Sequence, residues 1–163
     1  MDDTRQFRTI EGEGLDWDSL PMRLWSKGKK LGTWNPESID FSQDVEDWRE
    51  MSEMDREALM HVTAQCLGGE ESVTEDLVPL IVAISDEGRL EEEMYLTSFL
   101  FEEAKHVEVF CRFFDEVVDE PGDLTRFHDD HYETILHEAL PSAMHRLRDD
   151  RSPEAQAEAS ATY

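Results

Sequence analysis

The residue whose setting first indicates chemistry is Glu70, because every other member of its expected helix face is apolar. At spacings of three and four, this face comprises Leu59, Val62, Cys66, Glu70, Val73, Leu77, Leu80 and Ile84. A carboxylate in a buried apolar stripe costs several kcal/mol unless it is paired, protonated or bound to a cation. The neighbouring Glu71 lies about 100° round the helix, where it can face water. Glu70 is therefore the candidate functional carboxylate of this face.

A second apolar face carries two polar residues that are three positions apart. Its expected members are Leu96, Phe99, Glu103, His106, Phe110, Phe113 and Val117. A spacing of three stacks Glu103 and His106 on the same side of a helix, about one turn apart, which suits chelation of a single ion. The adjacent Glu102 lies off this face.

The two faces are placed almost symmetrically about Gly88, the expected turn between their helices. Glu70 lies 18 residues before Gly88, whereas Glu103 and His106 lie 15 and 18 residues after it. In an antiparallel hairpin with a rise of about 1.5 Å per residue, all three side chains lie about 22–27 Å from the turn. The spacing predicts that the three side chains meet at one level of a helical bundle.

Two carboxylates and an imidazole at one level predict a metal site. Oxygen and nitrogen donors without a thiolate favour manganese or iron over structural zinc. Two other interpretations stay open from the residues alone, namely that Glu70 and Glu103 pair with a buried Arg and that His106 is a hydrogen-bonded core residue. Di-iron and di-manganese bundles use one Glu from each of two helices and a Glu-x-x-His from each of the other two. The three residues would supply half of such a set.

The elements that must position these residues are expected to be helices throughout. Capping and turn signals, such as Ser52 followed by Asp55, divide the chain into helices of about 40–50, 53–86, 90–118, 123–148 and 153–163. Gly68-Gly69 and Pro79 are expected to bend the second helix, and Pro141 to break the fourth. No stretch shows the period of two that predicts a strand, so the expected fold class is all-α.

The chain is expected to divide into two parts of different character. Residues 1–35 are rich in Gly and isolated Trp, and they predict an irregular N-terminal arm that lies over the core. Residues 36–163 carry the helical patterns and predict the bundle itself. Both candidate faces fall in this second part, so the bundle is expected to hold the metal site.

The charge of the chain is strongly unbalanced, with 40 Asp and Glu against 15 Lys and Arg and a formal net charge of -25. Such a chain repels nucleic acid and anionic membranes, so neither is an expected partner. An acidic surface with only four Lys is typical of a halophilic protein, whereas an ordinary acidic protein is the alternative. Two separated Cys, no membrane-length apolar run and no secretory signal pattern predict a cytoplasmic location without a membrane span.

A second group of histidines lies near the expected fourth helix. The sequence His128-Asp129-Asp130-His131 is followed by His137 and His145. Because this segment is polar on several faces and lacks a matching partner helix, we interpret it as solvated surface rather than as a metal site. We interpret the four tryptophans as packing residues of the arm and core rather than as a cofactor site; they are Trp17, Trp25, Trp34 and Trp48.

Several stretches of the sequence together resemble a known family. They are Gly69-Glu70-Glu71-Ser72-Val73-Thr74-Glu75-Asp76-Leu77-Val78-Pro79, Glu93-Met94-Tyr95-Leu96-Thr97, Phe101-Glu102-Glu103-Ala104-Lys105-His106, Leu20-Pro21-Met22-Arg23-Leu24 and Ile39-Asp40-Phe41-Ser42. From about Gly14 to its last residue the chain resembles the ligand-binding oxidases related to the ribonucleotide reductase small subunit. The resemblance implies a ferritin-like four-helix bundle, of which this sequence matches the N-terminal half.

The resemblance also implies a cofactor and a ligand. The cofactor would contain one Mn and one Fe, or two Fe, and would activate O₂ beside a hydrophobic pocket for a long-chain fatty acid. Glu70, Glu103 and His106 match the family's first metal site, usually the manganese site, with Glu103 bridging the two metals. Oxygen activation in that family also forms an ether cross-link between a Val and a Tyr, which Val73 and Tyr163 match.

Part of the family's site has no counterpart in this sequence, because the second Glu and the second Glu-x-x-His set are absent. One hypothesis is the first half of an oxidase, which lacks a complete site when alone. A second is a homodimeric metal-binding or storage module of ferritin-like type, in which two copies each supply Glu70, Glu103 and His106 about a two-fold axis. A fragment of a ribonucleotide reductase small subunit and a metal-free remnant are further alternatives.

Overall fold

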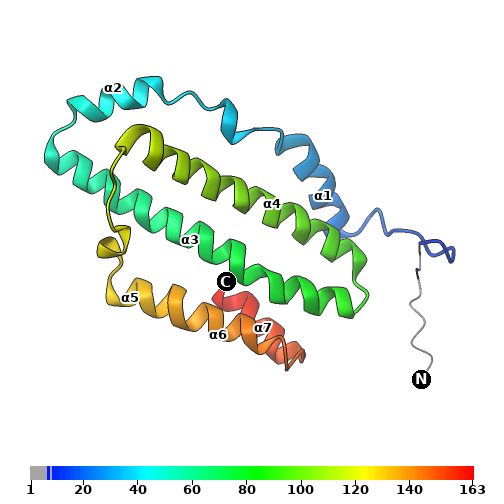
Figure 1. Ribbon diagram of the computed structural model, residues 1–163. Helices are drawn as coiled ribbons and strands as arrows, with labels where there is room; N and C mark the ends of the chain where they lie inside the picture. Colours follow the sequence, from blue (N-terminus) through cyan, green and yellow to red (C-terminus); the bar gives the residue numbers. More distant parts are fainter. Residues whose placement is uncertain (1–6, 8) are drawn as a thin grey trace.

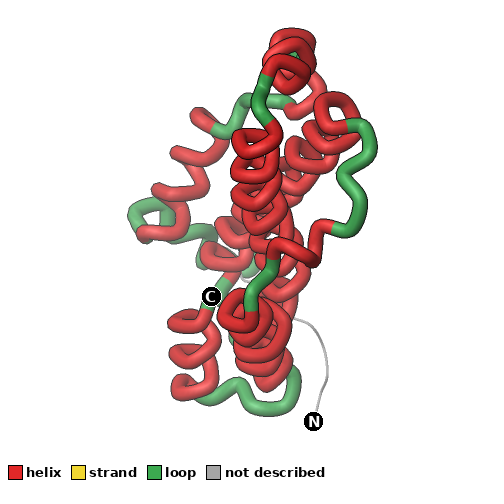
Figure 2. The backbone as a smooth tube through the Cα atoms, turned by 90° about the vertical axis from the view of Figure 1, so that its left-hand side faces the viewer, coloured by secondary structure: helices red, strands yellow, loops and turns green. Residues whose placement is uncertain are grey.

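The computed structural model describes residue 7 and residues 9–163, and all regular elements in this part are helical (Figures 1 and 2). The α-helices are α1 (Leu20–Leu31), α2 (Ser42–Glu50), α3 (Glu53–Asp86), α4 (Leu90–Phe113), α5 (Asp130–Glu133), α6 (Leu140–Arg146) and α7 (Pro153–Thr162). Two 3₁₀ turns, Pro36–Ser38 and Leu124–Phe127, and two π-helical stretches, Phe114–Val118 and Thr134–Ala139, join them. The expected all-α class is confirmed.

The centre of the fold is the antiparallel hairpin of α3 and α4 (Figure 1). Ser52 begins α3 as predicted, because its hydroxyl accepts a hydrogen bond from the backbone N–H of Asp55 at 3.2 Å. Gly88 makes the turn with a φ of 73°, a conformation that is open to Gly because it has no Cβ. The predicted ranges 53–86 and 90–118 agree with α3 and with α4 plus its π-helical continuation.

The main core lies between the hairpin and the C-terminal helices α6 and α7. The buried apolar residues of this core are Leu77, Leu80, Ile84, Leu140, Met144, Leu147, Ala155 and Ala159. Burying one Leu side chain completely contributes about 1.5–3 kcal/mol, so this cluster anchors the C-terminal helices on α3. A smaller core towards the other end of the hairpin contains Met60, Ala64, Phe114 and Phe127.

The segment 1–35, expected to be an irregular arm, contains the helix α1, which packs along α4. Pro21 lies in the first turn of α1, where an N–H has no intrahelical partner, and Met22 is buried. The sequence did not predict this helix, because isolated Gly and Trp residues in the segment indicated irregular structure. Residues 1–6 and 8 of the expected arm, which include the N-terminal stretch without a secretory signal pattern, lie outside the described residues. The division of the chain at residue 35 stays a prediction.

The expected helix 123–148 is split into shorter pieces. A 3₁₀ turn, α5, a π-helical stretch and α6 follow one another along this segment. Pro141 lies in the first turn of α6 and has no N–H to donate to the carbonyl of His137. The backbone widens to a π-helix, Thr134–Ala139, directly before this point. The predicted break at Pro141 therefore takes the form of a wider helical turn.

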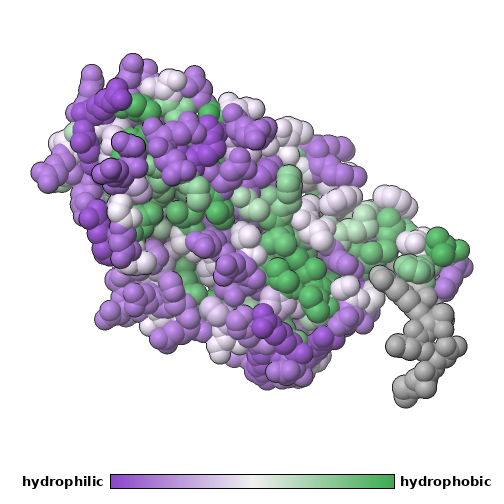
Figure 3. All heavy atoms as spheres, in the orientation of Figure 1, coloured by the Kyte–Doolittle hydropathy of each residue, from purple (hydrophilic) through white to green (hydrophobic). Residues whose placement is uncertain are grey.

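Some of the apolar surface of the hairpin is exposed. On the predicted stripe of α3, Val62 is 58% exposed and Cys66 is also exposed, whereas Leu77, Leu80 and Ile84 are buried. The visible face of the molecule carries patches of hydrophobic side chains within a hydrophilic surround (Figure 3). Among the described residues, no helix combines the length and the apolar character needed to cross a bilayer.

Candidate metal centre

The hairpin brings Glu70 of α3 together with Glu103 and His106 of α4. His106 Nδ1 lies 3.2 Å from Glu70 Oε2 and 3.2 Å from Glu103 Oε2. One potential ligand atom from each residue lies within 4.8 Å of the other two. Within the described part of the chain, no other group of three His, Cys, Asp or Glu side chains meets this distance. The structure thus places the three residues at one level of the hairpin, as their spacing from Gly88 predicted.

Glu103 carries the most perturbed carboxyl of this group. Burial, together with the hydrogen bond and the negative charge of Glu70, raises the pKa of the Glu103 carboxyl to about 6, whereas His106 acts to lower it. Two carboxylates this close repel each other unless a proton or a cation lies between them. The pair therefore favours a bound cation once Glu103 has lost its proton.

The three side chains are less buried than the sequence predicted. The exposed fractions are 12% for the Glu103 side chain, 26% for Glu70 and 40% for His106. The main core covers α3 nearer the Gly88 turn, around Leu77, and leaves His106 more open. The donor set nevertheless fits a first-row metal ion, because two carboxylate oxygens and one imidazole nitrogen converge from two packed helices.

A residue from the loop after α1 holds the ring of His106. The rings of Trp34 and His106 stack with centroids 5.6 Å apart and planes 21° apart. Trp34 Nε1 donates a hydrogen bond to Glu102 Oε2 at 2.8 Å, and Lys105 Nζ donates one to the backbone carbonyl of Trp34 at 3.1 Å. Lys105 is buried and pairs with Glu102 at 2.8 Å. Trp34, Glu102 and Lys105 form a unit that we call the Trp34 clamp.

The sequence pattern does not predict the Trp34 clamp, because it indicates packing for Trp34 and places Glu102 off the functional face. One signal was available, because Glu102 and Lys105 repeat the three-residue spacing of Glu103 and His106 one position earlier. Trp34 is remote in sequence, and no spacing rule connects it to α4. Its contribution depends on how the loop after α1 crosses α4.

An apolar hollow of about 320 Å³ lies beside the three converging residues. Its lining residues are Trp34, Ile39, Glu70, His106, Val109 and Phe110. Two potential ligand residues therefore face a space bounded mainly by hydrophobic side chains. Such a space has room for an apolar group.

Val73 and Tyr163, the residues proposed for a cross-link, lie on different elements. Val73 follows Glu70 on α3 and is half-buried, whereas Tyr163 follows α7 and packs against Phe99 with ring centroids 6.3 Å apart. Burial and the charges of nearby carboxylates, Glu103 first among them, raise the pKa of the Tyr163 phenol. Its hydroxyl is buried and makes no hydrogen bond to the described residues. The covalent bond between these two residues stays a prediction.

The histidines of the second group do not form a comparable site in the described residues. The His128 ring lies 4.3 Å from the ring of Tyr132 and 5.8 Å from that of His137, centroid to centroid, while His131 and His145 are exposed. This packing depends on Gly68, where a Cβ would come within 2.6 Å of the Tyr132 hydroxyl. Gly68 thus has a packing role that its expected effect on helix bending did not reveal.

Comparison with known proteins connects this geometry to a family. The model of the family "Ribonucleotide reductase, small chain" matches residues 22–141. An R2-like ligand-binding oxidase with an aerobically reconstituted Mn/Fe cofactor is 41% identical, with a TM-score of 0.94 over 98% of this chain and 55% of that chain. One variant of such an oxidase is 41% identical with a TM-score of 0.93, covering 98% of this chain and 58% of that chain. A further variant is 42% identical with a TM-score of 0.88, covering 91% and 54%. The chain spans just over half the length of these structures.

Proposed function

The chain belongs to the ribonucleotide reductase small-chain family, and on that premise we propose that it is part of an O₂-activating oxidase with a dinuclear Mn/Fe or di-iron centre. Glu70, Glu103 and His106 are the ligands of the first metal. The observation that carries this proposal is the convergence of their three donor atoms within 4.8 Å. Similarity to R2-like ligand-binding oxidases over 98% of the chain favours an oxidase over a reductase subunit.

Each side chain has a separate role in the proposed centre. Glu103 would hold the cation through its carboxylate, and the family resemblance assigns it a role shared with the second metal. His106 would bind through Nδ1, and Trp34 against its ring fixes the ring orientation. When bound, two adjacent reduced metals supply the electrons that activate O₂. Val109 and Phe110 would provide apolar surface next to the metals.

The centre needs ligands beyond these three residues. Three protein ligands leave coordination positions of the first ion open and provide no cage for a second. By family resemblance, one further Glu and one further Glu-x-x-His set complete the site. The isolated chain is therefore expected to bind one metal ion at most and to lack oxidase activity.

We also propose that a long-chain fatty acid binds beside the metals. The hollow lined by Trp34, Ile39, Val109 and Phe110 supports this assignment, because it is apolar and opens onto His106. The alkyl chain would lie against the hydrophobic lining, and the carboxylate would lie towards the metals. Added fatty acid is expected to change the electron paramagnetic resonance spectrum of bound Mn²⁺, and an unchanged spectrum would contradict this placement.

The proposed cross-link joins Val73 Cβ to the Tyr163 oxygen. Forming it breaks one C–H and one O–H bond and makes one C–O bond, and O₂ activated at the centre accepts the two electrons and two protons. With the completing ligand set present, aerobic Mn/Fe incorporation should lower the intact mass by that of two hydrogen atoms. Peptide mapping should then join the two residues. Separate peptides of unchanged mass would remove this part of the proposal.

The charge of the chain supports a proposal about its setting. A net charge of -25 favours function at high salt, where screening reduces repulsion between surface carboxylates. We propose a halophilic, cytoplasmic protein. If this is right, the free energy of unfolding should rise with NaCl concentration well beyond physiological ionic strength. A flat or falling dependence would favour an ordinary acidic protein.

A homodimeric metal-storage module is the second candidate, and the exposure of His106, Val62 and Cys66 favours it, because a second copy could cover them. Metal analysis and sedimentation of the purified chain separate the two functions. Two metal ions per stable dimer, lost in Glu103→Ala, would support storage. A monomer that binds one ion, and gains O₂-dependent chemistry only with the completing ligands, would support the oxidase.

A further inference from the structure

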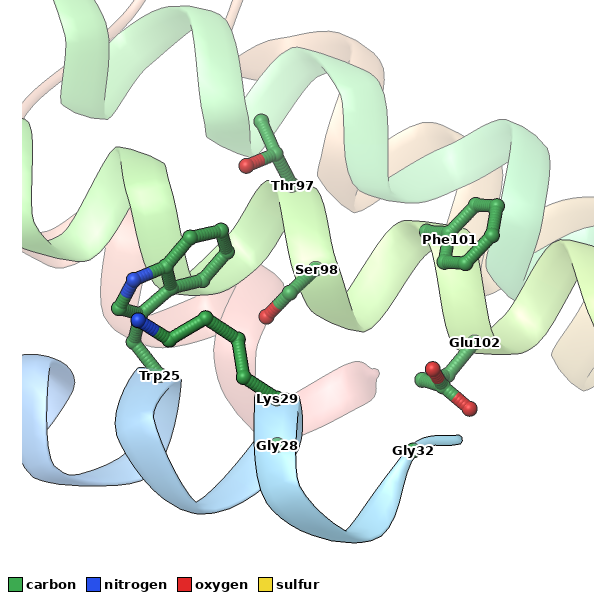
Figure 4. Close-up of a pocket in the computed structure, with 8 residues that line it drawn as sticks. All are labelled: Trp25, Gly28, Lys29, Gly32, Thr97, Ser98, Phe101 and Glu102. Atoms are coloured by element: carbon green, nitrogen blue, oxygen red, sulfur yellow. The ribbon is translucent and has the colours of Figure 1, made fainter. Parts of the chain in front are cut away.

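Two adjoining hollows lie between α1 and α4, and neither is lined by Glu70, Glu103 or His106. Figure 4 shows the first of them, the one lined by Trp25 and Phe101. Their volumes are about 300 Å³ and about 250 Å³. The residues that line both are Gly28, Ser98 and Glu102, so the two hollows adjoin where α1 faces α4, and we treat them together as one feature. We call it the α1–α4 groove.

The walls of the α1–α4 groove are mainly apolar and open. Trp25 and Phe101 line one hollow, and Phe101 is 62% exposed. Leu31 and Phe99 line the other, and Leu31 is 68% exposed. A Cβ built on Gly28 would meet no atom within 4 Å, so the backbone of α1 leaves space in the groove at this point. An alkyl chain could therefore lie along the groove against aromatic and aliphatic side chains.

The rim of the groove is positively charged in a strongly acidic chain. Lys27, Lys29 and Lys30 are three of its four lysines, and α1 contains no Asp or Glu. Lys27 lines one hollow and Lys29 the other, and Lys29 Nζ lies 5.2 Å from the centroid of the Trp25 ring (Figure 4). Favourable interaction with the C-terminal end of α1 explains cations at Lys29 and Lys30 but does not explain an apolar groove beside them.

The one carboxylate in the groove does not oppose an anion, because Glu102 is already paired. Lys105 Nζ lies 2.8 Å from its carboxylate, and Trp34 Nε1 donates a hydrogen bond to it. Lys105 is buried and so stays with Glu102. The charges free to bind a ligand at the rim are therefore the ammonium groups of Lys27 and Lys29.

We propose that the α1–α4 groove binds a single-chain amphiphile with an anionic head group. Its alkyl chain lies against Trp25 and Phe101, and its head group contacts Lys29 or, across Gly28, Lys27. This site is separate from the hollow beside His106 and requires no metal. The tests of this site therefore do not depend on the oxidase proposal.

The first test measures how the metal-free protein binds dodecanoate and dodecanol, which share an alkyl chain and differ in charge. Calorimetry should give an affinity for the carboxylate at least about tenfold higher than for the alcohol. The double variant Lys27→Gln/Lys29→Gln should lose this difference, whereas Lys30→Gln, a lysine of α1 outside both linings, should keep it. Equal affinity for the two amphiphiles, or an unaffected double variant, would overturn the proposal.

The second test fills the groove. Gly28→Leu places a side chain in open space within α1, and Leu favours the helix, so the fold should be kept. This variant should lose the dodecanoate binding that depends on Lys27 and Lys29, while Mn²⁺ affinity at the metal centre stays unchanged. Gly69→Leu is the matched control, because Gly69 also lies in a helix with no atom near its Cβ. Retention of the Lys27- and Lys29-dependent dodecanoate binding by a folded Gly28→Leu protein would contradict the proposed site.

A third comparison identifies the source of the anion. Vesicles of phosphatidylglycerol and of phosphatidylcholine present anionic and zwitterionic head groups on a bilayer. Binding to the anionic vesicles that depends on Lys27 and Lys29 and exceeds the binding of free dodecanoate would replace the single-chain amphiphile with a membrane lipid and would overturn the proposal. Binding of free dodecanoate without vesicle binding would support a free amphiphile. Failure of both probes to bind would overturn the proposal.

Discussion

Glu102 and Glu103 are neighbours on α4 with the same side chain, yet their surroundings differ in charge. Glu102 has a permanent cation, the buried Lys105, and a hydrogen bond from Trp34. Glu103 faces a second carboxylate, Glu70, and an imidazole that both share. Adjacent positions on the helix thus hold one carboxylate that is paired with a Lys and one that has no Lys or Arg partner among the described residues.

The comparison shows which property of a partly buried carboxylate indicates metal binding. The Glu103 side chain is 12% exposed and that of Glu102 is 29% exposed, so both are largely removed from water. What differs is whether the protein itself supplies the compensating charge. Glu102 is expected to act in stability and positioning, and Glu103 in binding a cation, and each prediction below tests that contrast.

The largest effect is expected on metal affinity, when the proposed ligand Glu103, which has no permanent cation beside it in the described part of the chain, is replaced. Glu103→Gln removes the charge and one oxygen donor and should lower Mn²⁺ affinity by more than about 100-fold, because second-shell changes alone cost 10–100-fold. Titration followed by electron paramagnetic resonance measures this affinity. Glu71→Gln, which removes an exposed carboxylate next to Glu70, is the control and should leave the affinity within about twofold. Similar losses in both variants would mean that general charge, not the site, attracts the metal.

Replacing Glu102, which is paired with Lys105, should change the stability of the fold. Glu102→Gln leaves the buried ammonium of Lys105 without its counter-charge and should lower the free energy of unfolding by about 1–3 kcal/mol. Glu108→Gln, an exposed position on the same helix, should change it by less than about 0.5 kcal/mol. Urea denaturation measures both. If the two variants were equally stable, the pairing of Glu102 with Lys105 would have no structural importance.

Trp34 contacts both His106 of the metal site and Glu102 of the ion pair, so its replacement should have an intermediate effect on metal binding. Trp34→Ala removes the ring that stacks on His106 and should lower Mn²⁺ affinity about tenfold. Trp34→Phe keeps a stacking ring but loses the hydrogen bond to Glu102, and should recover part of the loss. The expected order of affinity is wild type, Trp34→Phe, then Trp34→Ala. Unchanged affinity in a folded Trp34→Ala protein would limit the clamp to packing.

The smallest effect concerns pH in the metal-free protein. The pKa of Glu103 is raised from the ordinary 4.5 to about 6, so the folded state retains a proton that the unfolded state releases between these values. The free energy of unfolding should therefore fall as pH rises from 4.5 to 6. The contribution is below about 2 kcal/mol because solvent partly reaches the group.

The pH effect is isolated by comparing wild type with Glu103→Gln, because the other carboxylates titrate in both proteins. The variant should lack this fall and should be the more stable of the two above pH 6, where wild-type Glu103 is charged next to Glu70. Parallel stability curves for the two proteins would show that the two carboxylates do not repel each other in the folded state.

The parts of the fold that follow from local rules were predicted well. Ser52, Gly88 and the apolar periodicity of α3 and α4 define the hairpin through interactions between residues close in sequence. The position of Glu70 opposite Glu103 and His106 then follows from counting residues to the turn. The metal-site geometry was therefore accessible because it depends on one turn and on the rise of a helix.

The remaining features depend on contacts between segments that are remote in sequence. The stacking of Trp34 on His106, the groove between α1 and α4, and the close approach of Tyr132 to Gly68 all arise when separate elements pack. The partial exposure of His106 was also missed, because helical periodicity identifies a face but not whether another element covers it. Periodicity alone carries no information on such pairings.

The central claim is that Glu70, Glu103 and His106 hold a metal ion, and anomalous X-ray scattering from crystals grown with Mn²⁺ tests it most directly. We expect one strong peak within about 2.0–2.3 Å of a carboxylate oxygen of each Glu and of His106 Nδ1. No peak at this position, or a stronger peak beside His128 and His137, would contradict the claim.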